Sequence, residues 1–277
     1  MRGYTLRARY QPNWTPSWLK SKKKVTDDIF NPSYEDALRL PRAYVMIDAT
    51  RQRDGKKVVI KCVPTATEEL PIIQYLASPE LMADPTNQTV PLLDMMLLPH
   101  DDTEVLIVMP QLLNFDALPF RRVGEIYEAI QQYLQKIKWR ERWTVRPVPY
   151  QFVDFGISRR YPRGQLDVKD DTRFGQDKTV PEYRLPGPYN PFKADIYQLG
   201  NAFKKAIEKY DPDGLEELLA LCKEMTSPNA DDRPSAKAAL QILEAMDRRT
   251  LNRRIWNRRV TPIDKFQILH CWSTPLV

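Results

Sequence analysis

The sequence predicts an α+β chain in which strand-forming segments come first and helical segments follow. Two β-branched runs flank a polar turn between residues 44 and 63, and apolar residues recur at helical spacing along residues 123–137. Three further helical segments fill most of residues 192–248. We therefore expect a small sheet-rich lobe at residues 43–114 and a larger, mostly helical lobe at residues 115–248.

The two ends of the chain differ from this central part. Residues 1–42 contain four prolines and lack sustained helical or alternating periodicity, so they predict an irregular, basic N-terminal arm. Residues 249–277 are rich in arginine and predict a basic C-terminal tail.

Two hairpins and a short helix account for the sheet-rich lobe. The first hairpin is expected over residues 44–50 and 57–63, because these runs surround an Asp-Gly turn signal. A helix is expected over residues 67–77, with acidic residues in its first turn, where the helix dipole favours them. The second hairpin is expected over residues 90–98 and 104–109.

The helical lobe opens with a helix from about Val123 that stops near Trp139. A short strand at residues 150–153 and a long irregular segment follow. The remaining helices are expected over residues 192–208, 213–225 and 234–248. Pro234 falls in the first turn of the last helix, where proline is best tolerated.

Composition excludes several classes of protein. With 42% apolar and 28% charged residues, the 277-residue chain is globular rather than disordered throughout. Its longest segment without a charged residue, residues 266–277, is shorter than the roughly 18 to 20 residues that a transmembrane helix needs. No apolar leader follows the first basic residues, so we expect an intracellular protein, cytoplasmic or nuclear, without a membrane span.

Three residue types limit the chemistry that the chain can perform. The nine glycines are too widely spaced for a GxGxxG or GxxxxGK loop, because the closest pair, Gly156 and Gly164, is eight positions apart. The only histidines, His100 and His270, lie far apart, which excludes a histidine-rich metal site. The three cysteines form no CxxC pair, so we expect neither a disulfide framework nor a zinc site.

The positive charge is confined to the ends of the chain. Residues 1–60 and 246–277 carry net charges of +7 and +5, whereas the part between them carries −6. The basic residues gather at residues 20–24 and in arginine pairs along residues 248–259, where Trp256 is the only aromatic residue. We favour solvated tails over a nucleic-acid-binding surface, because no nucleic-acid motif accompanies these clusters.

Five short motifs stand in a fixed order along the chain. Val58-Val59-Ile60-Lys61 lies on an expected strand, and Asp154-Phe155-Gly156 directly follows another. Val180-Pro181-Glu182 comes 26 residues later. Asp195-Ile196-Tyr197-Gln198-Leu199-Gly200 lies in an expected helix, and Asp232-Arg233-Pro234-Ser235 begins the last one. They resemble the V-A-I-K, D-F-G, A-P-E, D-x-W-S-x-G and R-P-[ST] motifs of protein kinases.

The chain is similar to protein-kinase-like proteins of filamentous and mushroom-forming fungi over most of residues 4–248. The resemblance implies a two-lobe, protein-kinase-like fold. ATP and Mg²⁺ are the cofactors that it implies, with weak or absent binding expected for this chain. Lys61 would neutralise the α- and β-phosphates while Glu69 holds it. Asp154 would bind the metal ion, with Phe155 and Gly156 completing the motif.

The resemblance also implies roles in the helical lobe that are structural. Glu182 would pair with Arg233, and such a buried contact fixes geometry whether or not chemistry occurs. Asp195 would anchor backbone groups in the same lobe.

The catalytic loop of that family is missing. Kinases place an H-R-D-x-x-x-x-N segment before D-F-G, in which the Asp accepts the substrate proton and the Asn binds a second Mg²⁺. Between Val123 and Val153 there is no histidine, aspartate or asparagine, and the expected helix runs almost directly into the expected strand. A Gly-rich phosphate loop is excluded by the glycine spacing. The chain is therefore expected to be catalytically impaired, a pseudokinase or a scaffold for protein partners, and no catalytic residue is assigned.

Two alternatives remain at this point. The chain could be an incomplete version of an active Ser/Thr-type kinase that lacks an internal exon, which the abrupt junction between Ile137 and Tyr150 motivates. It could also be a basic-ended adaptor for nucleic acid. The sequence predicts no particular oligomeric state.

Overall fold

The structure, a computed structural model, describes residues 3–15, 45–84, 87–112, 114–115, 119–134, 150–162, 164–173, 175 and 177–256. Within them the chain is α+β, as the sequence predicts. It divides into two compact units. The sheet unit comprises Met1–Ala83, Thr89–Leu113 and Phe152–Ser158, and the helical unit comprises Asp84–Gln88, Asn114–Gln151 and Arg159–Val277.

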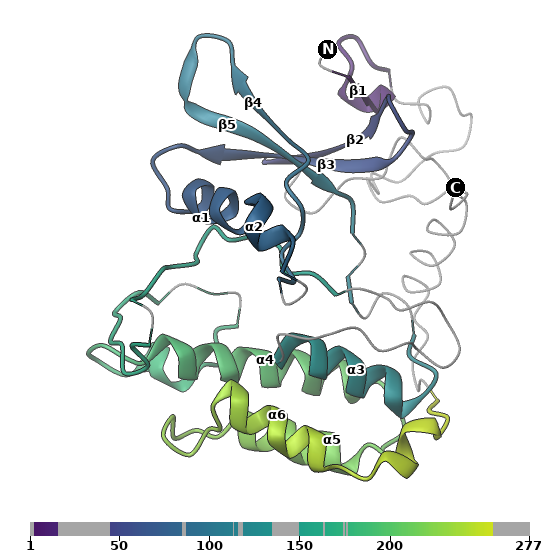
Figure 1. Cartoon of the computed structure of the whole chain (residues 1–277), viewed down its shortest axis with the longest axis vertical. Coiled ribbons are helices and arrows are strands. Elements are labelled where there is room, and N and C mark those ends of the chain that lie inside the picture. Colours follow the sequence, from purple (N-terminus) through teal and green to yellow (C-terminus); the bar gives the residue numbers. More distant parts are fainter. Residues whose placement is uncertain are drawn as a thin grey trace. The chain divides into compact units, whose positions relative to one another are not determined.

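An antiparallel sheet forms the body of the sheet unit (Figure 1), with strand order β1-β2-β3-β5-β4 among the described residues. The strands are β1 (Tyr4–Leu6), β2 (Met46–Arg51), β3 (Lys57–Pro64), β4 (Asp94–Leu98) and β5 (Asp101–Pro110). The two predicted hairpins are confirmed as β2–β3 and β4–β5. In the first, Gly55 adopts φ +70°, a backbone conformation that glycine accepts without a steric penalty.

Two helices accompany the sheet. Helix α1 (Glu69–Leu76) confirms the helix predicted over residues 67–77. Helix α2 (Pro79–Met82) was not expected, and its first turn is capped by the Ser78 side chain, which accepts a hydrogen bond from the Leu81 backbone N–H.

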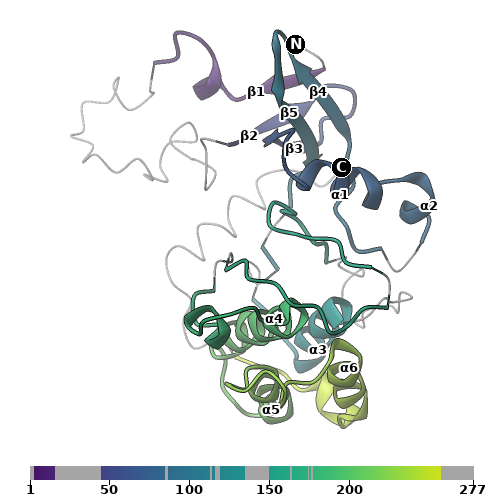
Figure 2. The ribbon, with the colours of Figure 1, turned by 90° about the vertical axis from the view of Figure 1, so that its left-hand side faces the viewer.

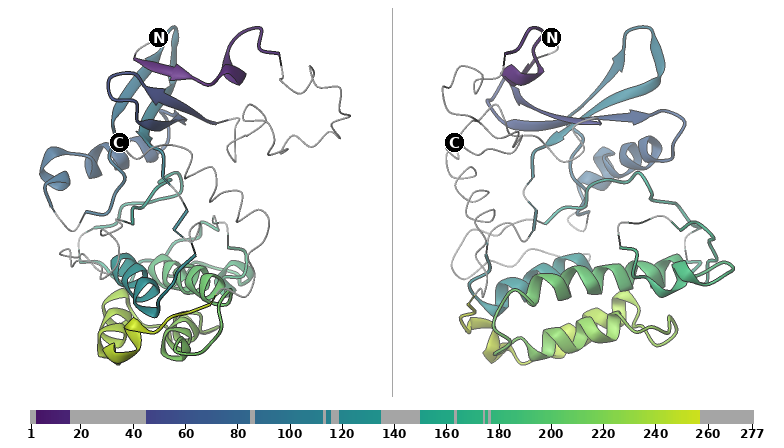
Figure 3. Two further views of the ribbon diagram at one scale, coloured as in Figure 1. Left: turned by 90° about the vertical axis from the view of Figure 1, so that its right-hand side faces the viewer. Right: turned by 180° about the vertical axis from the view of Figure 1, so that it is seen from behind.

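Side-chain alternation gives the sheet two faces. Because strand residues that pair in register point the same way, Lys61 shares a face with Met46 and Ile107, and Ile60 lies on the other. Helix α1 covers the face that carries Lys61 (Figure 3), which we call the helix face. Its buried core is Val63, Ile73, Val90, Val105, Ile107 and Met109. The buried cluster of the opposite face is Tyr4, Ala49, Val58, Ile60, Met96 and Val108.

Strand β1 corrects the expectation of an irregular arm over residues 1–42. Tyr4–Leu6 pairs antiparallel with β2, and Tyr4 is buried on the face opposite α1. Its hydroxyl donates a hydrogen bond to Asp94 at 3.1 Å. Three residues are too few to show the alternation that predicts a strand. The strand could therefore not be predicted from the sequence and is recognised by its pairing with β2. The rest of the arm from Pro16, including the basic run at residues 20–24, lies outside the described residues.

The helical unit is built from α3 (Val123–Leu134), α4 (Pro191–Ile207), α5 (Glu216–Met225) and α6 (Ala236–Ala245). These confirm the helices predicted in this part of the chain, although α5 starts three residues later than expected. Helices α3 and α4 form one layer, and α5 and α6 form the other (Figure 2). Short 3₁₀ turns flank them: η4 (Pro181–Arg184) precedes α4, and η5 (Arg248–Asn252) follows α6.

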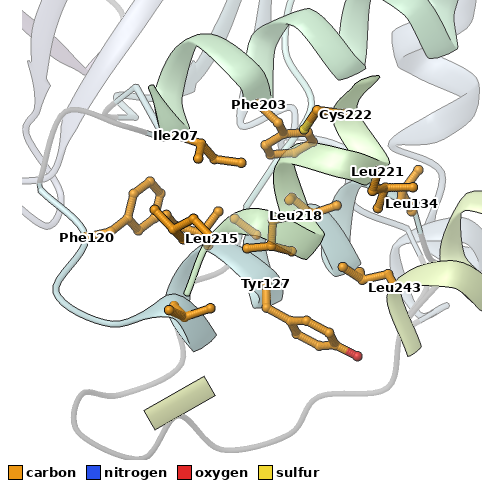
Figure 4. Packing of buried hydrophobic residues seen from close by; sticks show 14 of the residues in the cluster. Phe120, Tyr127, Leu134, Phe203, Ile207, Leu215, Leu218, Leu221, Cys222 and Leu243 are labelled. Carbon is orange, nitrogen blue, oxygen red and sulfur yellow. The ribbon is translucent and has the colours of Figure 1, made fainter. Parts of the chain in front are cut away.

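The core of the helical unit lies between these two layers. Figure 4 shows side chains from all four helices meeting there, including Tyr127, Phe203, Leu218 and Leu243. Gly200 makes the contact between α4 and α5 very close, because a Cβ atom at this position would lie 2.7 Å from the Met225 Cβ.

The last helix begins later than predicted. Ser235 is its N-cap, and the Ser235 hydroxyl oxygen accepts a hydrogen bond from the Ala238 N–H at 3.1 Å. Pro234 therefore precedes the helix instead of lying in its first turn. The side-chain cap decides where the helix starts, and proline is compatible with either position.

The strand predicted at residues 150–153 is wrong. Only an isolated parallel bridge joins Phe152 to Thr89, and the side chains of Phe152 and Val153 are exposed. Residues 135–149, which include most of the junction between Ile137 and Tyr150, lie outside the described residues, as do residues 257–277 of the predicted tail. Among the described residues, no helix has the length and apolar character that a membrane-spanning segment requires.

Candidate functional site

Lys61 and Glu69 are brought together by consecutive elements of the sheet unit. Lys61 lies on β3, the third strand of the chain, and points to the helix face. Glu69 is the first residue of α1, where a carboxylate is favoured by the helix dipole. Ile73 anchors α1 in the core of the helix face, which holds Glu69 in front of the Lys61 side chain.

Lys61 bridges two carboxylates. Its ammonium group donates a hydrogen bond to Glu69 and a second to Asp154 Oδ1 at 2.8 Å. The side chains of Lys61 and Glu69 are 12% and 6% exposed, whereas that of Asp154 is 43% exposed. Burial alone would lower the pKa of Lys61, but its hydrogen bonds to Asp154 and Glu69 raise it above the usual value. Lys61 is therefore a fixed positive charge near neutral pH.

The segment that carries Asp154 is attached to the same unit. The backbone N–H of Val90 donates to the Phe152 carbonyl at 3.1 Å, and Phe155 packs on the core of the helix face. Asp154 has φ +66°, a left-handed conformation that is uncommon for a residue with a side chain. Such backbone conformations cluster at functional sites, because the surrounding structure must hold them in place.

Gly156 allows these groups to approach one another. A Cβ atom on Gly156 would lie 3.1 Å from Glu69 Oε2 and 3.5 Å from Asp154 Oδ1. Any larger residue at this position would push against the carboxylate that holds Lys61. Sequence order alone does not reveal this contact, since 87 positions separate Gly156 from Glu69.

The cluster has the charges needed to hold a phosphorylated ligand. One lysine and two carboxylates leave a formal charge of −1, so a divalent cation near Asp154 would be favoured together with an anionic ligand near Lys61. The described residues contain no group of three or more His, Cys, Asp or Glu side chains that could bind a metal unaided. Mg²⁺ commonly takes one or two carboxylates plus substrate phosphates, so Asp154 fits a metal ion that arrives with its ligand.

In the helical unit, Arg233 is held by Glu182 in a bidentate ion pair, with N–O distances of 2.6 and 2.7 Å. Its guanidinium group also donates to the carbonyls of Ser227, Lys193 and Pro228. The Arg233 side chain is fully buried and lies over the Tyr197 ring, 4.7 Å from the centroid. This pair joins η4 to α4 and to the turn before α6, which is a structural role.

The anchoring role that the resemblance implies for Asp195 stays a prediction. Asp195 lies on α4 at a solvent-exposed position, although the protein atoms around its carboxyl group raise its pKa to about 6 by desolvation. Its carboxylate makes no hydrogen bond or ion pair to any of the described residues.

Comparisons with known proteins do not assign this chain to a family. No family model matches the chain, and no curated protein is significantly similar to it. The site therefore has to be interpreted from its own residues.

Sequence reasoning missed a second buried carboxylate on the helix face. Asp48 on β2 is 3% exposed, and its carboxylate forms an ion pair with Arg7 and accepts a hydrogen bond from the Tyr10 hydroxyl at 3.0 Å. An acidic residue inside an apolar, strand-forming run was the available signal, because such a residue is buried only when it is paired. Its partners could not be found from the sequence, since about 40 positions separate them from Asp48.

Proposed function

We propose that the chain is a protein-kinase-like nucleotide-binding protein that does not transfer phosphate efficiently, a pseudokinase that works by binding. The observation that carries this proposal is the Lys61 bridge. In protein kinases a lysine on the third strand pairs with a glutamate on the following helix, and the DFG aspartate binds Mg²⁺. Here Lys61 on β3 contacts both Glu69 on α1 and Asp154.

The nucleotide would use these residues in distinct ways. Lys61 would neutralise phosphate oxygens, and Glu69 would keep its ammonium group in position. The Asp154 carboxylate would hold Mg²⁺ together with the phosphates, and the ion would offset the charge that the phosphates bring into the site.

Weak or absent catalysis follows from the missing groups. Residues 123–153 contain neither an aspartate that could be the catalytic base nor an asparagine that could bind the second metal ion. Loss of a positioned general base alone costs on the order of 10² to 10⁴ in rate.

Binding is tested by calorimetry and thermal shift with Mg·ATP. We expect micromolar affinity for the wild type, and a ligand at a hundred times its Kd would stabilise the fold by about 2.7 kcal/mol. Lys61→Ala should abolish the effect, measured against that variant's own melting temperature. Lys57→Ala is the matched control, because Lys57 lies on the same strand but only contacts Thr50 at the surface. No thermal shift of the wild type at millimolar Mg·ATP would remove the proposal.

A second candidate is an incomplete version of an active kinase. It is motivated by the short connection between α3 and Tyr150. Sequencing the full-length transcript across the codons for Lys138–Pro149 decides between the two. A longer transcript that encodes an H-R-D-x-x-x-x-N segment would favour the active kinase. A transcript that matches the given sequence across these codons would favour the pseudokinase.

A further inference from the structure

A polar cluster lies on the helix face near Lys61. We call it the latch; it consists of Asp48 on β2 and its partners Arg7 and Tyr10. The β2–β3 register pairs Met46 with Lys61 and Asp48 with Val59, so the Asp48 carboxylate is on the same face as the Lys61 ammonium group. Arg7 binds one oxygen of this carboxylate, and the Tyr10 hydroxyl binds the other. Residues 7–10, which we call the strap, therefore cover this part of the helix face.

The strap covers the part of the helix face, next to Val59 and Asp48, into which a ligand held at Lys61 could extend along β3. Towards the end of the strand, the helix face is filled, because Val63, Ile73 and Ile107 are each 1% exposed or less. Towards the start of the strand lies Val59, which is only half-buried. A ligand with its phosphates on Lys61 would place its remaining atoms here, next to Asp48.

One contact stabilises the closed form of the strap, and one unsatisfied hydrogen-bond donor destabilises it. Arg9 stacks on Tyr10 and on Trp14, with its guanidinium carbon 5.8 and 5.5 Å from the ring centroids, so the strap keeps local order of its own. Arg7 Nη1, in contrast, is buried without a hydrogen-bond acceptor among the described residues. A buried donor without a partner destabilises the closed form relative to one in which water reaches it.

The connection between β1 and β2, residues 7–45, contains no glycine, so the sequence predicts no glycine-rich phosphate loop there. The start of this connection instead carries Arg7 and Tyr10 to the Asp48 carboxylate.

We propose that the strap is an autoinhibitory contact, which must leave Asp48 before a nucleotide can occupy the helix face at Lys61. This inference rests on the nucleotide binding proposed above. A strap that is closed about nine-tenths of the time lowers the apparent affinity about tenfold, because only the open fraction binds. Release of the strap therefore raises affinity without adding any contact to the ligand.

The test compares the Kd of Mg·ATP, measured by calorimetry, for the wild type and two latch variants. Asp48→Asn removes the charge that holds Arg7, and Tyr10→Phe removes only the hydroxyl that Asp48 accepts from. We expect up to about tenfold tighter binding for either variant, together with faster hydrogen exchange of the β1 amides. Arg53→Ala is the control. Arg53 is exposed and does not contact Asp48, so the substitution changes the charge of the same unit without affecting the strap.

The outcomes separate the strap from nucleotide binding itself. Equal Kd values for all variants would overturn the strap and leave nucleotide binding intact, and weaker binding by the latch variants would also overturn it. Tighter binding by both latch variants than by the wild type, with the Arg53→Ala control unchanged, would support the strap. No binding by any variant would remove both proposals. Should Asp48→Asn fail to fold, as its circular dichroism would show, Tyr10→Phe carries the test because it deletes a single oxygen atom.

Discussion

Replacing Glu182 with glutamine is expected to destabilise the helical unit by about 3–5 kcal/mol, because it leaves the Arg233 guanidinium buried without a counter-charge. The side chain of Arg233 is 0% exposed, so water cannot take over the role of the carboxylate. The glutamine oxygen can keep at most one of the two hydrogen bonds, and its amide nitrogen is a donor that cannot accept the other. At roughly 1.5–3 kcal/mol for each bond to a charged group, the two bonds together are worth about 3–6 kcal/mol, which covers the expected range.

Urea unfolding followed by far-UV circular dichroism measures this loss. A double-mutant cycle with Glu182→Leu and Arg233→Met isolates the pair, and we expect the double variant to be more stable than the sum of the single losses implies. Asp213→Asn is the matched control, since Asp213 pairs with Arg253 at the surface at 3.3 Å and should contribute at most about 1 kcal/mol. A loss for Glu182→Gln no larger than that of the control would refute the reasoning.

Three further measurements test other parts of the structure. Gly200→Ala should lower the free energy of unfolding by about 1–3 kcal/mol, since its methyl group would overlap Met225, and unchanged urea stability would contradict the close helix contact. Burial alone would raise the pKa of Asp170, but hydrogen bonds from neighbouring groups lower it to about 2. Its stabilising effect is therefore present above the unfolded value of about 3.8 and is lost as pH falls towards 2. Asp170→Asn should flatten the acid-unfolding profile over that interval, and an unchanged profile would count against the assignment. Burial raises the pKa of the Cys222 thiol to about 12, so in a Cys62→Ser, Cys271→Ser background it should resist alkylation at pH 8 until urea unfolds the helical unit. Rapid labelling of the folded protein would contradict its burial.

Local patterns were sufficient to predict most of the elements. The β2–β3 hairpin is fixed by an Asp-Gly turn between two β-branched runs, and α5 by apolar residues that recur at helical spacing. Both signals lie within one segment of chain. The run at residues 150–153 carries the same local signal, but among the described residues it forms only an isolated bridge to Thr89, because strand formation depends on pairing as well as on propensity.

The candidate site was predictable only as a set of motifs. The resemblance to protein kinases implied that Lys61, Glu69 and Asp154 belong together, but not that Lys61 contacts both carboxylates at once. That contact depends on the left-handed backbone at Asp154 and on the missing side chain of Gly156. Neither property is visible before the segment is placed beside α1.

The position of β1 has a consequence for folding. Residues 7–45 separate it from β2, whereas only residues 52–56 separate β2 from β3. Closing the longer loop costs about 2 kcal/mol more chain entropy, and three paired residues return little of it. We expect β1 to join the sheet last during folding and to detach first under denaturant. Each detachment would leave β2 as an unprotected edge strand, so the chain's tendency to aggregate should depend on how firmly its first ten residues are held.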